Sequence, residues 1–296
     1  MNQLAITLIY PFESEFMVRA LVAAVILGFC APLIGTFVVQ RKLSLVGDGL
    51  GHVAAAGVGL ALWLDFAPQW VALIATVFAA IMIEWIFHLS KSTDTALAII
   101  FYSGIAASIT FAGKSANQGQ LQQYLFGSLL SVTWLEIILL AAICLIASLA
   151  ILLLSKVLLS IAIDESSAKI AGINTHIVHV ILMCSVAFIV SVSMSITGLL
   201  LVSAVMVVPV MTSRLMNSGF YRAWISSALL GVFGTVLGLG LSRVMDLAPG
   251  GTIVLTHVGL FIFVSLIFSL LHQIRRSDRE HDHVHPIDEP HTLPMR

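Results

Sequence analysis

The segment GTFVVQRKLSLVGDGLGHVAAAGVGLAL, residues 35–62, indicates the architecture of this protein more directly than any other stretch. From Gly47 onward the segment is dominated by glycine, alanine, valine and leucine, and this part contains two ionisable side chains, Asp48 and His52. Small residues allow the backbones of neighbouring transmembrane helices to approach closely. The segment therefore predicts a helix packed in the interior of a membrane bundle, not one that faces lipid.

The composition of the whole chain agrees with this prediction. Of the 296 residues, 59% are hydrophobic and 10% are charged, whereas a soluble domain is about half apolar and a quarter charged. Such a composition excludes a largely disordered chain and leaves too few charged residues to cover a soluble enzyme. The net charge of −1 gives no reason to expect nucleic-acid binding. No GxxxxGK[ST] loop is present, so we expect no ATP hydrolysis by that route.

We predict an all-α, polytopic membrane bundle of about eight or nine transmembrane helices, because a span needs roughly 20 mostly apolar residues. The apolar segments lie near residues 16–39, 48–64, 67–88, 94–112, 132–155, 176–194, 197–213, 220–243 and 251–271. A further stretch, residues 121–132, is expected to be a re-entrant or interfacial helix.

The distribution of lysine and arginine predicts the orientation of the chain. With nine spans and the N-terminus outside, 11 of the 14 Lys and Arg residues face the cytoplasm. Residues 1–15 then form an extracytoplasmic segment, which lacks the basic n-region of a cleaved signal peptide. Residues 16–272 form the transmembrane domain, and residues 273–296 form a polar cytoplasmic tail that we expect to be disordered.

Asp48 and His52 are the strongest candidates for chemistry inside the membrane. They are four residues apart and therefore share one face of a helix. A carboxylate and an imidazole on one face can bind a borderline divalent cation such as Zn²⁺ or Mn²⁺, although two ligands make an incomplete site. The alternative is structural: Asp48 caps the start of the helix, and His52 forms a hydrogen bond with a neighbouring helix.

The remaining histidines allow weaker hypotheses. His257 lies deep in the last span, where a hydrogen bond in the core is the simpler interpretation and a pathway ligand the alternative. Glu84 and His88 share a face near a cytoplasmic helix end, and we interpret them, like His176 and His179, as solvated at the membrane interface. The tail carries His281, His283, His285 and His291, which either bind metal weakly or are merely solvated.

The loop DESSAKIAGINT, residues 164–175, is the most polar internal segment. Its two leading acids favour a helix N-terminus, and Gly172 suits the residue after a helix C-terminus. We predict a short amphipathic helix on the cytoplasmic side. The segment is poor in large apolar residues and not strongly basic, which favours docking to a protein over binding to the membrane surface.

Several segments together resemble the permeases of metal-type ABC importers, which import zinc, manganese or iron in bacteria. The resemblance covers most of residues 16–272. The matching segments are GTFVVQRKLSLVGDGLGHVAAAGVGLAL (35–62), LFGSLLSVTW (125–134), DESSAKIAGINT (164–175), GLLLVSAVMVVPVMTSRLM (198–216) and DLAPGGTIVLTHVGLFIF (246–263).

This resemblance implies a membrane permease domain with the helical fold of the vitamin B12 and siderophore importers. It implies a chain that is not itself an enzyme and has no catalytic residues or bound cofactor. Two copies would form the pathway in the bacterial inner membrane. Separate ATPase subunits would dock on the cytoplasmic side, and an extracytoplasmic metal-binding protein would deliver the ion.

The resemblance also assigns roles to individual residues. Asp48 and His52 match the Asp and His of the family's GD-x-L-x-H motif and would be metal ligands in the pathway. Asp164, Glu165, Ala168 and Gly172 match the region that couples the permease to the ATPase. The sequence departs from the family pattern at Val53, where alanine is common, and at residues 166–167, where two serines replace a more acidic or bulky stretch.

The transported ion is expected to be a divalent transition metal. The His-rich tail favours zinc over manganese, because imidazole suits Zn²⁺ and carboxylate-rich sites suit Mn²⁺. Two other functions remain open from the residues alone. One is an ion-coupled secondary transporter or channel, and the other is a membrane sensor that reads cytoplasmic metal with the tail.

Overall fold

The computed structural model describes residues 14–90, 92–114, 129–216 and 219–282, together with residues 119, 122, 124 and 127. In this part of the chain every regular element is a helix. Nine helices are long and apolar enough to cross a membrane, which confirms the predicted all-α bundle. They are α2 (Glu15–Gln40), α3 (Val46–Trp63), α4 (Pro68–Ser90), α5 (Thr93–Ala112), α7 (Trp134–Ile163), α9 (Thr175–Thr197), α10 (Leu199–Met216), α11 (Phe220–Met245) and α12 (Pro249–Asp282, apolar as far as Leu270).

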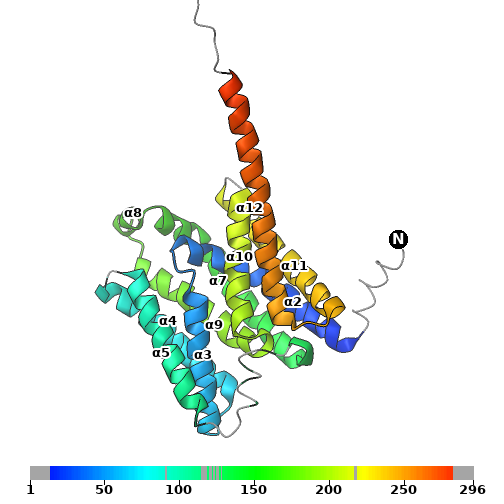
Figure 1. Ribbon diagram of the computed structural model, residues 1–296. Coiled ribbons are helices and arrows are strands. Elements are labelled where there is room, and N and C mark those ends of the chain that lie inside the picture. The colour runs from blue at the N-terminus through cyan, green and yellow to red at the C-terminus, as the bar shows by residue number, and fades with distance from the viewer. Residues whose placement is uncertain are drawn as a thin grey trace, which may run out of the picture.

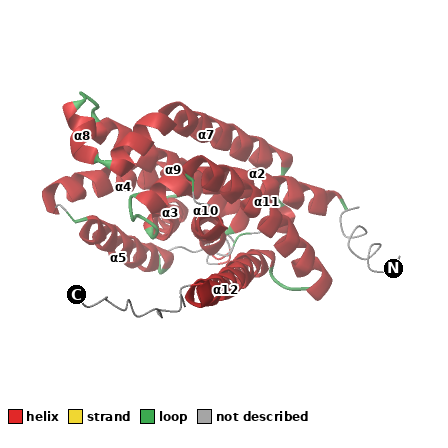
Figure 2. Ribbon diagram, turned by 90° about the horizontal axis from the view of Figure 1, so that it is seen from above, coloured by secondary structure: helices red, strands yellow, loops and turns green. Residues whose placement is uncertain are grey.

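The helices pack into one bundle around a shared apolar core (Figure 1). Helix α2 packs against α7, α10 and α11, whereas α3 packs against α4, α5, α9 and α10. Seen from above, α9 and α10 lie in the middle of the molecule, with α7 and α12 on opposite sides (Figure 2). Helix α2 is buried along most of its length and α12 is mostly exposed, so α12 presents its apolar side chains to the surroundings of the bundle.

Close packing at glycines explains why small residues recur in these spans. A Cβ atom added at Gly231 of α11 would lie 2.1 Å from the carbonyl oxygen of Gly28 in α2. Likewise, a Cβ at Gly238 would lie 2.6 Å from the Cα of Ile253 in α12. The backbones of these helices are therefore in contact, as expected where small residues replace larger ones at an interface between transmembrane helices.

The C-terminal helix extends further than the sequence predicted. Helix α12 continues to Asp282 and projects beyond the bundle (Figure 1). We expected disorder from residue 273 onward, and this expectation fails for residues 273–282. The physical reason is that extending an existing helix avoids the cost of nucleation, and this stretch contains no proline or glycine.

Two other predictions concern segments that lie mostly outside the residues that the structure describes. The stretch 121–132, expected as a re-entrant or interfacial helix, is described mainly at its end, where η2 (Leu129–Ser131) forms a turn of 3₁₀-helix. The tail histidines His283, His285 and His291 lie outside the described residues, and for His281 the structure describes the helical backbone alone.

Candidate functional site

Asp48 and His52 lie on the first two turns of α3. The helix begins at Val46, and Leu45 occupies the N-cap position without a side-chain capping bond. The alternative that Asp48 is the helix cap is therefore wrong, because Asp48 lies inside the first turn. Both side chains are half-buried, so the pair lies near the surface of this one chain and is open to further ligands.

Helix α5 forms one wall beside this pair. The ring of Phe101 meets the imidazole of His52 edge to face, with ring centroids 5.1 Å apart and an interplanar angle of 86°. A Cβ atom at Gly104 would lie 3.0 Å from the backbone nitrogen of Val53, so α5 lies directly against α3. Within the described part of the chain, His52 makes no hydrogen bond, and its ring nitrogens are available to a ligand.

His257 lies in a different part of the bundle. It is 2% exposed and lies against α11, where a Cβ atom at Gly234 would come within 2.1 Å of the imidazole. Helix α12 packs against α10 and α11, whereas α3 packs mainly against α5 and α4. The Nε2 atom of His257 finds no hydrogen-bond partner among the described residues. The structure therefore supports neither the expected core hydrogen bond at Nε2 nor a direct link with Asp48 and His52.

The loop between α7 and α9 forms the short helix that the sequence predicted. This helix, α8, spans Glu165–Ile170. The Asp164 carboxylate accepts hydrogen bonds from the backbone N–H of Ser166 and from the hydroxyl of Ser167. These bonds lower the pKa of Asp164, with the contacts from Ser167 acting most strongly. Asp164 is therefore the N-cap residue of α8 and favours its charged form.

The end of α8 is a Schellman motif. The backbone N–H of Ile173 donates to the carbonyl of Ala168, and the N–H of Gly172 donates to the carbonyl of Lys169. Gly172 has a φ of +85°, which glycine adopts without the steric penalty that other residues incur. The prediction that Gly172 ends this helix is confirmed.

The two faces of α8 have different environments. Ala168 is 2% exposed and anchors the helix against the bundle, whereas Ile170 is 88% exposed. Glu165 contacts Lys169 at 2.8 Å and accepts a hydrogen bond of 3.5 Å from Thr175, the first residue of α9. Burial would raise the pKa of Glu165, but its contacts with Lys169, together with the nearby His179 and Arg41, outweigh this and hold the pKa below its usual value. Helix α8 is thus fixed on one side and presents an apolar side chain on the other.

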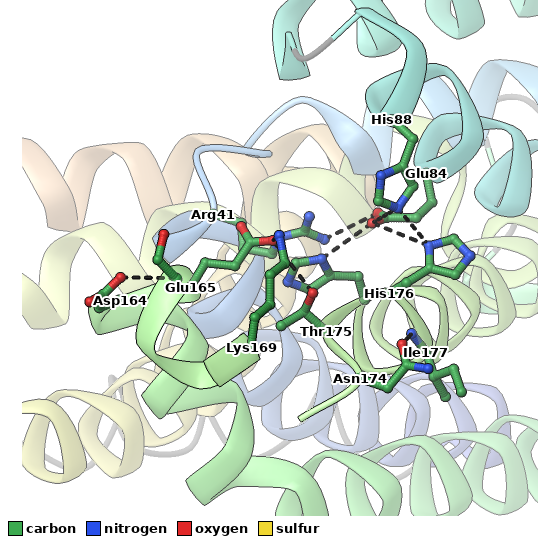
Figure 3. Close-up of polar contacts among 12 residues, drawn as sticks. Arg41, Glu84, His88, Asp164, Glu165, Lys169, Asn174, Thr175, His176 and Ile177 are labelled. Carbon is green, nitrogen blue, oxygen red and sulfur yellow. Dashed lines mark hydrogen bonds and ion pairs between the residues drawn. The ribbon is translucent and has the colours of Figure 1, made fainter. Parts of the chain in front are cut away.

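The structure also contains a polar cluster whose environment differs from the one that the sequence predicted. The Oε1 atom of Glu84 lies 3.9 Å from Nε2 of His88 and 4.0 Å from Nδ1 of His176 (Figure 3). The same atom lies 3.2 Å from Nδ1 of His179. The Oε2 atom of Glu84 lies 3.5 Å from Nη1 of Arg41. Glu84 and His179 are 1% and 2% exposed, so the expectation that they are solvated at the interface is wrong.

Two local signals pointed toward this cluster. Glu84 and His88 share one helix face at i,i+4, and His176 and His179 share another at i,i+3. Nothing in the sequence indicates that the two faces meet, because the contact requires α4 to pack against α9.

A cavity connects this cluster with α8. Its volume is about 210 Å³, and its lining includes Arg41, Phe87, Glu165 and His179. Burial lowers the pKa of Arg41, and the neighbouring Glu84 opposes this effect. Ionisable side chains of the loop after α2 (Arg41), of α8 (Glu165) and of α9 (His179) therefore share one small space beside the predicted coupling segment.

Comparison with known proteins places this arrangement among transport systems. The profile of the ABC 3 transport family matches residues 13–268, which include all nine apolar helices as far as residue 268. The chain is 30% identical over 84% of its length to the high-affinity zinc uptake system membrane protein ZnuB of Haemophilus influenzae, and the match covers 96% of that protein. It is 29% identical over 84% of its length to the manganese import system permease protein ScaB of Streptococcus parasanguinis, covering 90% of it.

A solved structure shares the fold. PsaBC from Streptococcus pneumoniae, determined in complex with Fab, superposes with a TM-score of 0.78 at 28% identity, covering 88% of this chain and 95% of that one.

Proposed function

This chain belongs to the ABC 3 transport family, and from this membership we propose that it carries a divalent transition metal ion into the cytoplasm as the permease subunit of an ATP-driven importer. The observation that carries the proposal is the match of residues 13–268, because it extends over nearly the whole membrane bundle and includes Asp48 and His52. In this role the chain provides the pathway, and a separate subunit hydrolyses ATP.

Asp48 and His52 are the proposed ligands of the ion in the pathway. Both are half-buried on one face of α3, and the described contacts leave the ring nitrogens of His52 without a hydrogen-bond partner. Two ligands hold an ion weakly enough to let it leave, which suits transport. The remaining ligands would come from water or from a second copy of the chain.

We propose zinc as the preferred ion and manganese as the alternative. Relatives of similar identity include a zinc uptake protein and a manganese import permease, so similarity alone does not separate the two ions. The preference rests on imidazole chemistry in the pathway and on the tail histidines His281, His283 and His285, which suit Zn²⁺ better than Mn²⁺.

The proposed assembly contains two copies of this chain, two ATPase subunits and an extracytoplasmic metal-binding protein in the bacterial inner membrane. Helix α8 is the proposed contact with the ATPase, since Ile170 is 88% exposed on a polar segment outside the apolar spans. An exposed apolar side chain on a short, fixed helix suits insertion into a groove of a partner protein. With the N-terminus outside, α8 faces the cytoplasm, as this contact requires.

The first test measures cellular metal by mass spectrometry. An importer-deficient bacterial host expresses this chain with the ATPase and binding-protein subunits of its transporter. We expect zinc content to rise, and to return to the host level when the ATPase carries an inactivating change in its phosphate-binding loop. A rise that persists without ATP hydrolysis would indicate a secondary transporter or channel, and a rise in manganese alone would refute the preference for zinc.

Gly172→Val is expected to uncouple the permease from its ATPase. Valine at a φ of +85° is strained by about 1–3 kcal/mol, so the end of α8 should rearrange. No neighbouring atom lies within 4 Å of the added Cβ, so the bundle itself should be unaffected. We expect metal-stimulated ATP hydrolysis by the reconstituted complex to fall several-fold at normal membrane abundance.

Gly219→Val is the matched control for this test. Gly219 has a φ of −121° and also has no atom within 4 Å of an added Cβ. Hydrolysis should remain near the wild-type rate in this variant. Wild-type hydrolysis in Gly172→Val would remove the coupling role assigned to α8.

A further inference from the structure

We propose that Glu84, His88 and His176 form a second metal site, separate from Asp48 and His52, which binds Zn²⁺ or a chemically similar ion at the α8 end of the bundle. Each residue directs one ligand atom into the same small space, namely Oε1 of Glu84, Nε2 of His88 and Nδ1 of His176 (Figure 3). One carboxylate and two imidazoles are typical ligands of borderline ions such as Zn²⁺ and Co²⁺.

The distances fit such an ion with small adjustments. The three ligand atoms are separated by 2.8 Å between the two imidazoles, and by 3.9 Å and 4.0 Å between each imidazole and the carboxylate. Tetrahedral zinc with bonds of about 2.0–2.1 Å places its ligands about 3.3 Å apart. The metal would replace the proton that now lies between His88 and His176, as binding to deprotonated ligands requires.

The surroundings of Glu84 hold its carboxylate in place for this role. His179 contacts the same Oε1 atom at 3.2 Å, and Arg41 contacts Oε2 at 3.5 Å. Glu84 is therefore oriented from two sides, by the buried His179 and the half-buried Arg41. It still directs Oε1 toward His88 and His176. Partners that orient a ligating carboxylate in this way are a regular feature of metal sites.

The site is open on its other side. The side chains of His88 and His176 are 41% and 51% exposed, whereas that of Glu84 is 2% exposed. A fourth ligand could therefore be water, and an ion could enter without opening of the bundle. Such a position suits an exchangeable ion better than a permanently enclosed structural one.

The proposed metal site lies close to the contacts that hold α8 in place. His176 follows Thr175, which donates a hydrogen bond to Glu165 of α8. Arg41, on the other side of Glu84, lines the same cavity as Glu165. An ion bound by His176 would therefore lie next to the contacts that fix α8.

The test uses the full chain, purified without other subunits and stripped of metal with a chelator. In the parent variant, Asp48→Ala and His52→Ala remove the proposed pathway ligands, and glutamine replaces the other candidate ligands at His257, His281, His283, His285 and His291. This parent chain is also the matched control, because its substitutions leave the cluster intact. We expect it to bind one Co²⁺ per chain with the visible spectrum of a tetrahedral ion, and Zn²⁺ to displace the Co²⁺.

Adding His88→Gln or His176→Gln to the parent chain should weaken Zn²⁺ binding by at least about 10-fold. His176→Cys should keep the ion and add a thiolate-to-cobalt charge-transfer band. Absence of a tetrahedral Co²⁺ spectrum in the parent, or unchanged affinity in both glutamine variants, would overturn the proposal. The test requires no transport, so its outcome is independent of the proposed importer function.

Discussion

Asp48→Ala and His52→Ala are each expected to reduce metal accumulation by about 10- to 100-fold relative to the wild-type importer. The physical reason is that each substitution removes one of the two ligands that this chain contributes to the proposed pathway site, so the remaining group alone cannot replace the hydration shell of a divalent ion. Neither side chain makes a hydrogen bond within the described structure, so the loss of either should leave the bundle intact.

The measurement is cellular metal content at matched membrane abundance, with Asp94→Ala as the control. Asp94, like Asp48, is an acid in the first turn of a transmembrane helix, but it lies on the exposed surface at the start of α5. Asp94→Ala should accumulate metal as the wild type does. If Asp48→Ala and His52→Ala also accumulate metal normally, the pathway lies elsewhere and His257 becomes the next residue to test.

Glu84→Ala is expected to lower the thermal stability of the purified chain markedly. The Glu84 carboxylate is the counter-ion of Arg41, and the side chains of the two residues are 2% and 15% exposed. Removing one partner of a buried ion pair leaves a charge without compensation and typically costs about 3–5 kcal/mol. We therefore expect a clear decrease in the midpoint of thermal unfolding in detergent micelles.

Glu15→Ala is the matched control, because Glu15 also faces an arginine, Arg19, at 3.9 Å, but with 74% of its side chain exposed. An exposed ion pair of this kind contributes at most about 1 kcal/mol. A decrease in Glu84→Ala no larger than in Glu15→Ala would show that the cluster does not stabilise the bundle. Glu84→Met combined with Arg41→Met should recover part of the loss, since no unpaired charge then remains.

The sequence alone was sufficient to predict the spans. All nine predicted segments correspond to helices of the structure, because the need to bury about 20 apolar residues in a bilayer is a local property of each segment. Local signals also identified α8, where Asp164 provides the N-cap and Gly172 adopts the left-handed conformation that ends the helix. Caps depend on a few consecutive residues and can therefore be recognised in the sequence.

The spacing of glycines was less informative than the helix caps. It indicated where helices pack closely, but not which helix is the partner. Gly234 and Gly238 are four residues apart, a GxxxG spacing that is typical of closely packed transmembrane helices, and the structure places them against His257 and Ile253 of α12. The same spacing would serve an interface with a second copy equally well. Whether these glycines contact another helix of the same chain or a second copy depends on which helix lies opposite them. No local pattern in the sequence specifies that helix.

The polar cluster around Glu84 depended most strongly on tertiary structure. Glu84 and His179 are separated by 95 positions in the chain, yet they are 3.2 Å apart. Each lies near a helix end, where solvation was the reasonable expectation from sequence. The packing of α4 against α9 buries both and brings His88 to His176.

The sequence by itself thus determined which segments cross the membrane and where α8 begins and ends, because these depend on neighbouring residues. Only the tertiary structure decided which ionisable groups meet, because that depends on helices that are distant in the chain.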